Sequence, residues 1–181
     1  MRRAVHESVQ FRIKFCQLFV FQNHLLFILS GPEPQRTILE NRVIDEVSHY
    51  PGTATVVRGL PLVQSVIPSS AMIKFYNHLP ASELNEEIEK ADWVISRPGY
   101  STIMDLAKLQ KKSILIPTPG QTEQEYLAKK LCQKKMAFCV EQKEFSLSPA
   151  LENAKEFNYR LSSLTDPSGL RGASKDFLSR L

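Results

Sequence analysis

The sequence predicts an α/β domain with three layers, in which helices cover both faces of a parallel sheet of about six strands. From residue 25 onward, short apolar runs rich in Ile, Val and Phe alternate with amphipathic stretches of about 10 to 15 residues. This alternation indicates repeated strand and helix units, whose helices supply the crossover connections that parallel strands need. A chain of 181 residues with 43% hydrophobic composition is also large enough to bury one sizeable core.

Six apolar runs have the composition of buried strands. They occupy residues 25–29, 53–57, 72–76, 93–96, 113–116 and 137–140. The predicted helices between and after them span residues 38–47, 82–90, 102–109, 123–134 and 149–157. Tyr50, Pro51 and Gly52 end the first helix, and Ser82 is a suitable N-cap for the second. The predicted order is that of a Rossmann-like domain, and the proline-containing connector 58–71 is assigned no element.

The two ends of the chain depart from this pattern. Residues 1–24 combine a basic start with apolar runs, but Arg12, Lys14 and other polar residues keep every run shorter than the roughly 18 residues of a membrane span. We interpret residues 1–24 as an N-terminal extension or the remnant of a preceding domain. Residues 25–160 then form the domain, and residues 161–181 form a C-terminal tail with a short helix.

Charge and cysteine content exclude several classes of protein. Lys and Arg number 23 against 19 Asp and Glu, a net charge of +4, and they form no stripe with interleaved aromatic residues, so we expect no nucleic-acid partner. The mild excess favours small anions or a peripheral contact with a membrane surface. Cys16, Cys132 and Cys139 form no CxxC pair and have no His at zinc-ligand spacing. This predicts structural cysteines, no metal and a reducing, cytoplasmic location.

Ligands of parallel α/β sheets bind beyond the carboxyl ends of the strands, so the loops that follow strands are the informative ones. These loops are SGPEPQR at 30–36, NHLPAS at 77–82, SRPGYST at 96–102 and PTPGQTEQ at 117–124. The first loop is the poorest phosphate cradle, because Pro32 and Pro34 have no N–H group. Its candidate anion partners are Ser30, Arg36 and Thr37. A purely structural turn is an equally good interpretation of this loop.

The loop SRPGYST has the clearest chemistry. We expect Gly99 to take a positive φ and let the backbone approach a ligand. Ser101 and Thr102 open a helix whose free N–H groups suit a phosphate. Asp105 follows one helical turn later, where a carboxylate accepts hydrogen bonds from vicinal hydroxyls. The structural alternative is a simple turn at Gly99, with Asp105 complementing the helix dipole.

The loop PTPGQTEQ precedes another helix. Thr122 and Glu125 are spaced as a capping box, which explains both residues without a ligand. The box leaves Gln121 and Gln124 unexplained, and amides that both donate and accept hydrogen bonds suit sugar hydroxyls. We interpret His78, the only histidine beside these loops, as structural, so no catalytic residue is assigned.

These loops, in this order, resemble the C-terminal domain of family 28 glycosyltransferases, a GT-B family that includes the bacterial enzyme adding N-acetylglucosamine to lipid I. The strongest match is ADWVISRPGYSTIMDLAKLQKKSILIPTPGQTEQEYLAKKL, within a resemblance over residues 25–157. It implies one half of a GT-B fold and a UDP-sugar as donor substrate, with no cofactor.

The resemblance also implies roles for individual residues. The donor-binding set comprises Ser30 and Gly31 near the α-phosphate, the backbone of Leu79 at uracil, Gly99, Tyr100, Ser101 and Thr102 at the diphosphate with Arg97 in the same loop, Asp105 at the ribose, and Gln121, Gln124 and Glu125 at the sugar. The chain departs from the family at Asp105, where relatives usually have Glu, and at Glu125, where they have Gln.

The function implied is donor binding in the transfer of a hexosyl or N-acetylhexosaminyl group from a UDP-sugar. GT-B enzymes take the acceptor from an N-terminal domain, so we expect this chain alone to be inactive or very weak, and to need that domain or a partner chain. We expect a cytoplasmic location, with peripheral contact at the inner face of the membrane. Two alternatives stay open: a UDP-sugar hydrolase or 2-epimerase of GT-B architecture, and a non-catalytic half that works with a separate membrane-bound acceptor subunit.

Overall fold

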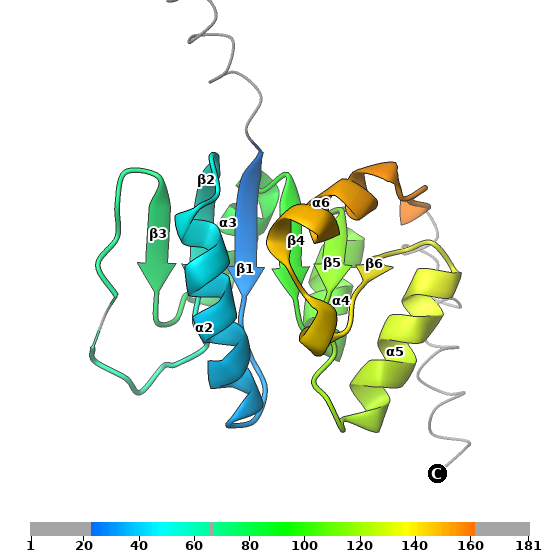
Figure 1. Ribbon diagram of the computed structural model, residues 1–181, viewed down its shortest axis with the longest axis horizontal. Coiled ribbons are helices and arrows are strands. Elements are labelled where there is room, and N and C mark those ends of the chain that lie inside the picture. Colours follow the sequence, from blue (N-terminus) through cyan, green and yellow to red (C-terminus); the bar gives the residue numbers. More distant parts are fainter. Residues whose placement is uncertain (1–22, 66, 162–181) are drawn as a thin grey trace, which may run out of the picture.

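The computed structural model describes residues 23–65 and 67–161 and confirms an α/β domain built on a six-stranded parallel sheet (Figure 1). The strands are β1 (His24–Ile28), β2 (Thr53–Val57), β3 (Ile73–Tyr76), β4 (Trp93–Ser96), β5 (Ser113–Leu115) and β6 (Phe138–Cys139). Their order is β3-β2-β1-β4-β5-β6, and all neighbours are parallel. The predicted N-terminal extension, with Cys16, and the C-terminal tail lie almost wholly outside the described residues.

Helices cover both faces of the sheet, as predicted. They are α2 (Gln35–Ser48), α3 (Ala81–Lys90), α4 (Tyr100–Lys108), α5 (Thr122–Gln133) and α6 (Leu147–Glu156), with a short 3-10 helix η1 (Gln142–Glu144). Successive side chains of a strand point to opposite faces, so β1 serves two cores. Leu25 and Phe27 pack in the core under α2 and α6, whereas Leu26 and Ile28 pack in the core under α3, α4 and α5.

The order of the strands creates a switch point at the centre of the sheet. β1 pairs with β2 on one side and with β4 on the other. The chain moves outward from β1 to β3, returns to β4, and then moves outward in the other direction to β6 (Figure 1). At such a point the loops leaving the two central strands diverge, and a crevice opens at their carboxyl ends.

The starts of the helices are set by the backbone conformation of the preceding residue and not by a side-chain cap. The predicted N-cap Ser82 is wrong: α3 begins at Ala81 after Pro80, whose extended backbone (ψ 156°) ends the preceding loop, and the helix has no side-chain cap. Helix α6 begins at Leu147, before the predicted Pro149. A proline is tolerated there because the first turn needs no N–H donor.

The amino ends of β1 and β2 share a small polar cluster around His24. Its backbone N–H donates to Asp92 Oδ2 at 2.7 Å, and its ring Nδ1 lies 2.8 Å from Thr53 Oγ1. Thr55 Oγ1, beside the same ring, donates to Glu87 Oε2 at 2.9 Å. Burial lowers the pKa of His24 below its ordinary value, against the opposing pull of Glu87 and Asp92.

This pKa shift makes a testable contribution to stability. His24 is protonated more easily in the unfolded chain, where its pKa is about 6.5, than in the folded domain. The free energy of unfolding is therefore highest above that pH, where His24 is neutral in both states, and it decreases as the pH falls through the lower folded pKa. We expect the melting temperature to fall as the pH is lowered through about 6.5 and on through the lower folded pKa, and to fall less in His24→Gln. Thermal unfolding followed by circular dichroism measures both slopes. Equal slopes would show that His24 is not the titrating group.

Candidate functional site

The loops after β4 and β5 meet around a pocket at the carboxyl edge of the sheet. The strands are neighbours, with Ser96 opposite Leu115, so their loops leave the sheet side by side. The pocket has a volume of about 330 Å³ and is lined by Pro98, Gly99, Tyr100, Gly120, Gln121, Thr122, Glu123 and Gln124. It lies between the N-terminal ends of α4 and α5, so two of the loops singled out in the sequence form one site.

The N-terminal end of α4 carries the free N–H groups of the site. Gly99 is the N-cap, and the first helical bond runs from the N–H of Ile103 to the Gly99 carbonyl at 2.9 Å. The N–H groups of Tyr100, Ser101 and Thr102 therefore have no acceptor within the helix. No acidic residue lies in this first turn, so the positive end of the helix is open to an anion.

The expectation of a positive φ at Gly99 is wrong. Its backbone is extended, with φ −75° and ψ 143°, as an N-cap requires, and its N–H donates to the Arg97 carbonyl at 2.8 Å. A Cβ added there would contact only Thr102 Oγ1, at 3.9 Å. Neither the backbone nor its surroundings require a glycine. Asp105, one turn into α4, is half-buried and lies outside the lining of the pocket.

The N-terminal end of α5 is held by two of its own side chains. Gln124 Oε1 accepts the Thr118 N–H at 3.0 Å, and Glu125 Oε1 accepts the Gly120 N–H at 2.9 Å. The predicted capping box is therefore wrong: Gln121, not Thr122, is the N-cap, and Glu125 reaches the loop one residue further back. Gln124 lines the pocket, and its amide nitrogen is available as a donor.

Glu125 lies on the far side of the same loop from the pocket. It lines a second cavity of about 830 Å³ between α5, β6 and η1, together with Cys132 and Cys139. Both cysteines are free, and the Cys139 thiol donates to the Ala128 carbonyl at 3.0 Å. Of the two residues that the resemblance assigns to the sugar at this helix, only Gln124 faces the first pocket.

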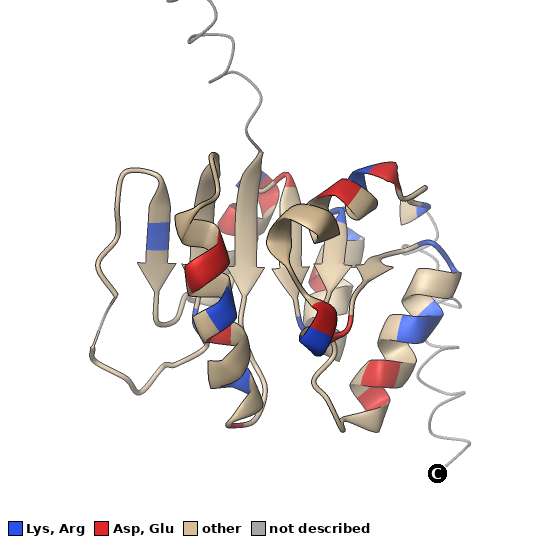
Figure 2. Ribbon diagram, viewed as in Figure 1, with Lys and Arg blue, Asp and Glu red and all other residues tan. Residues whose placement is uncertain are grey.

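The ends of α4 and α5 differ in charge. The first turn of α5 contains Glu123 and Glu125, which appear in red at its lower end (Figure 2). Carboxylates already occupy the positive end of the α5 dipole and repel a further anion. The pocket therefore combines one wall that suits a phosphate, at α4, with another that offers the amides of Gln121 and Gln124 and the carboxylate of Glu123 to hydroxyl groups, at α5.

Arg97 directly precedes the pocket residue Pro98, but it is buried and does not line the pocket. Its side chain is only 1% exposed, which leaves no surface for a ligand. Nη1 donates to the carbonyls of Ile116 and Pro117 at 3.0 and 3.1 Å, and Nη2 donates to the Gln35 carbonyl at 3.1 Å and to Gln142 Oε1 at 2.5 Å. Burial lowers the pKa of Arg97 to about 10. In this structure, Arg97 therefore cannot make the direct contact with the donor that the resemblance implies.

The loops after β1 and β3 stay outside the lining of the pocket. Ser30 and Gly31 are exposed beyond β1, and the φ of Gly31, +109°, is one that other residues rarely adopt. A Cβ on Gly31 would also lie 3.2 Å from Thr118 Oγ1, so its backbone packs closely on the β5 loop. The Leu79 side chain is buried in the core, and His78 is exposed.

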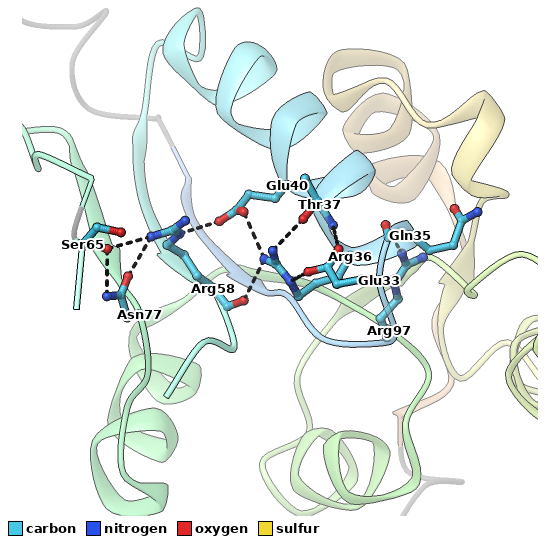
Figure 3. A network of polar contacts seen from close by, with 9 residues as sticks. All are labelled: Glu33, Gln35, Arg36, Thr37, Glu40, Arg58, Ser65, Asn77 and Arg97. Carbon is cyan, nitrogen blue, oxygen red and sulfur yellow. Dashed lines mark hydrogen bonds and ion pairs between the residues drawn. The ribbon is translucent and has the colours of Figure 1, made fainter. Parts of the chain in front are cut away.

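A buried ionic network that the sequence did not predict holds the β1 side of the edge (Figure 3). Arg36 binds Glu33 at 2.6 Å and Glu40 at 3.0 Å, and Glu40 also accepts from Arg58. Arg58 continues to Asn77 Oδ1 at 2.8 Å. Arg36 therefore does not face a free anion, as was considered above, because two carboxylates already neutralise it. The i, i+4 spacing of Arg36 and Glu40 on a helix was the available signal.

Two further observations concern classes of site. Within residues 23–65 and 67–161, no group of three or more His, Cys, Asp and Glu side chains is arranged to hold a metal ion. In the same part of the chain, no helix combines the length and the apolar character that crossing a membrane requires.

Residues 66–173, more than half of the chain, match the model of the glycosyltransferase family 28 C-terminal domain. The chain belongs to this family. A relative from Rickettsia akari (strain Hartford) is 35% identical to this chain over 96 residues, which are 52% of this chain and 24% of the relative. A relative from Bacillus cytotoxicus is 33% identical over 110 residues, 60% of this chain and 28% of the relative.

Both relatives are named "UDP-N-acetylglucosamine--N-acetylmuramyl-(pentapeptide) pyrophosphoryl-undecaprenol N-acetylglucosamine transferase". This chain spans only about a quarter of the length of these two relatives. Among solved structures, MurG of Acinetobacter baumannii is similar with a TM-score of 0.57 and 16% identity, over 90% of this chain and 51% of that one. The glycotransferase of kitacinnamycin gives 0.56 and 13%, over 87% and 39%. Identities this low show a shared fold, the GT-B half that the sequence predicted.

Proposed function

We propose that this chain binds the UDP-sugar donor of a two-domain glycosyltransferase, with the diphosphate against the N-terminal end of α4. The observation that carries this proposal is the open first turn of α4, free of acidic residues, whose N-cap Gly99 and first residue Tyr100 line a pocket at the carboxyl edge of the sheet, while Ser101 and Thr102 follow outside its lining. The names of the relatives support UDP as the nucleotide and N-acetylglucosamine as the sugar.

The proposed chemistry is stabilisation of the leaving group. Transfer of the sugar leaves its charge on the β-phosphate of UDP, and N–H groups fixed at a helix end are already oriented toward that charge. Ser101 and Thr102 supply N–H groups and hydroxyls at this position. Gln121 and Gln124 line the opposite wall and are our candidates for the sugar hydroxyls. No metal is required for this role.

The remaining parts of the reaction come from outside this domain in our proposal. The acceptor and the base belong to an N-terminal domain or partner chain, so the domain alone transfers no sugar or does so very slowly. The relatives' names contain a pyrophosphoryl-undecaprenol acceptor, which is a lipid. We therefore place the assembled protein in the cytoplasm, in peripheral contact with the membrane.

Titration of the chain with UDP tests the proposal. We expect backbone amide signals of residues 99–105 to shift, with a dissociation constant on the order of 0.1 to 1 mM, because half of the cleft is missing. Two-dimensional amide NMR measures the shifts, and uridine, which lacks the phosphates, is the control. Unchanged signals over residues 99–105 at saturating UDP would overturn the proposal.

A further inference from the structure

Among residues 23–65 and 67–161, Arg97 is a buried cation without a carboxylate partner. The acceptors of its two Nη atoms are three backbone carbonyls and the amide oxygen of Gln142, all of which are neutral. Two other arginines of the carboxyl edge differ from it, since the buried Arg36 and the partly buried Arg58 share the carboxylate of Glu40 (Figure 3). The β4–β5 half of this edge therefore keeps a net positive charge beneath its surface, and the β1–β2 half does not.

Three polar atoms around Arg97 are buried without a hydrogen-bond partner in the part of the chain that the structure describes. They are Arg97 Nε, Ser96 Oγ and Thr118 Oγ1. Two of them lie around Gly31, where an added Cβ would be 3.2 Å from Thr118 Oγ1 and 3.9 Å from Arg97 Nε. Unpartnered polar atoms are costly in a protein interior and concentrate where function constrains the residues. This cluster joins the ends of β1, β4 and β5.

Arg97 is also coupled to both walls of the pocket. Its carbonyl accepts the N–H of Gly99, the N-cap of α4, and its guanidinium binds the carbonyls of Ile116 and Pro117 at the start of the β5 loop. The side chain of Gln142, its fourth acceptor, lies on η1, which Arg42 holds through the Gln142 carbonyl at 2.6 Å. One residue therefore contacts both walls, the N-cap of α4 through its backbone and the start of the β5 loop through its guanidinium.

We propose that Arg97 is a positioning residue of the donor site, which holds the β5 wall through its guanidinium and the N-cap of α4 through its carbonyl, and which attracts the diphosphate without touching it. This inference rests on the function proposed above. In the interior of a protein a charge acts over a longer distance than in water, because the effective dielectric constant is lower and salt screens it less. An uncompensated cation on the residue two positions before Gly99, the N-cap of α4, adds to the field of the helix dipole.

Gln142→Glu separates the charge of Arg97 from its contacts. The new carboxylate accepts the same hydrogen bond from Nη2 but neutralises the guanidinium. The bond from Gln142 Nε2 to Gln35 Oε1, at 2.8 Å, is lost, and the Gln35 amide can turn to donate to the new carboxylate instead. We expect the dissociation constant for UDP to rise about five- to tenfold and that for uridine to stay unchanged. Calorimetric or NMR titration measures both.

Gln133→Glu is the matched control, since it adds the same charge at an exposed position in the last turn of α5. We expect it to leave UDP affinity unchanged. If the unchanged chain does not bind UDP, the proposed function fails and this inference fails with it. Two other results would overturn only the role of Arg97, provided that the unchanged chain binds UDP. In the first, Gln142→Glu binds UDP as well as the unchanged chain does. In the second, Gln142→Glu loses affinity for UDP and for uridine to the same extent.

A pair of variants at Arg97 itself keeps the test decisive if Gln142→Glu does not fold. Arg97→Lys and Arg97→Gln both lose the planar fork that joins the β5 loop to α2 and η1, but only the lysine keeps the charge. We expect both to melt at lower temperature, and the ratio of UDP to uridine affinity to fall about fivefold further in the glutamine variant. Equal ratios in the two variants would overturn a role for the charge.

Discussion

Ser101→Asp is expected to abolish detectable UDP binding while leaving the domain folded. Ser101 is the second residue of α4, and its exposed side chain lies beside the free N–H groups of the first turn. A carboxylate there occupies the place proposed for the diphosphate. Two like charges about 5 Å apart repel by roughly 3 kcal/mol at the effective dielectric constant of a protein surface, so we expect the dissociation constant to rise roughly 100-fold. The same carboxylate favours the helix dipole by about 0.3 to 1 kcal/mol.

Ser82→Asp provides a closely matched control. Ser82 is the second residue of α3 and is also exposed, so the substitution has the same charge and the same helical position. It should stabilise the domain slightly and leave UDP affinity unchanged. Amide NMR titrations and urea unfolding of both variants give the four values needed. Wild-type UDP affinity in Ser101→Asp would exclude the end of α4 as the phosphate site.

The fold was predictable because the four central strands, β1, β2, β4 and β5, are buried on both faces. The runs Thr53–Val57 and Trp93–Ser96 have the bounds predicted, since continuous apolar composition and flanking turn residues mark a central parallel strand. The starts of helices were less predictable. Pro80, Gly99 and Gln121 are the N-caps of α3, α4 and α5, and none of these helices has a side-chain cap. Rules based on Ser and Thr caps therefore place the starts one or two residues too late.

Part of the site was predictable for the same reason. β4 and β5 are consecutive in the chain and adjacent in the sheet, so the loops that follow them had to lie together. The separation of Gln124 from Glu125 was not predictable, because it depends on how each side chain returns to the loop before α5. The burial of Arg97 was not predictable either, since its partner Gln142 lies 45 residues later in the chain.

The ionic network on the other side of the switch point shows the same limit. Arg36 and Glu40 are one turn apart on α2, but Arg58 reaches Glu40 only because β1 and β2 are paired. Glu40 is 4% exposed and accepts from both the buried Arg36 and the partly buried Arg58, so one carboxylate is shared by two cations. Figure 3 shows this carboxylate between them. Removing one member of a buried ionic group costs far more than removing an exposed pair, because the remaining charges stay buried.

Glu40→Gln is therefore expected to destabilise the domain by about 3 kcal/mol, without a change in shape. The neutral amide can accept from one arginine only, and its own N–H₂ group then faces the other. Glu86→Gln is the control, because its carboxylate lies 3.9 Å from Lys90 Nζ at an exposed position of α3, where an ion pair contributes less than about 1 kcal/mol. Urea unfolding compares the two variants. A loss in Glu40→Gln no larger than that in Glu86→Gln would mean that the two arginines are solvated or paired elsewhere, and that the β1 side of the edge is not held by this carboxylate.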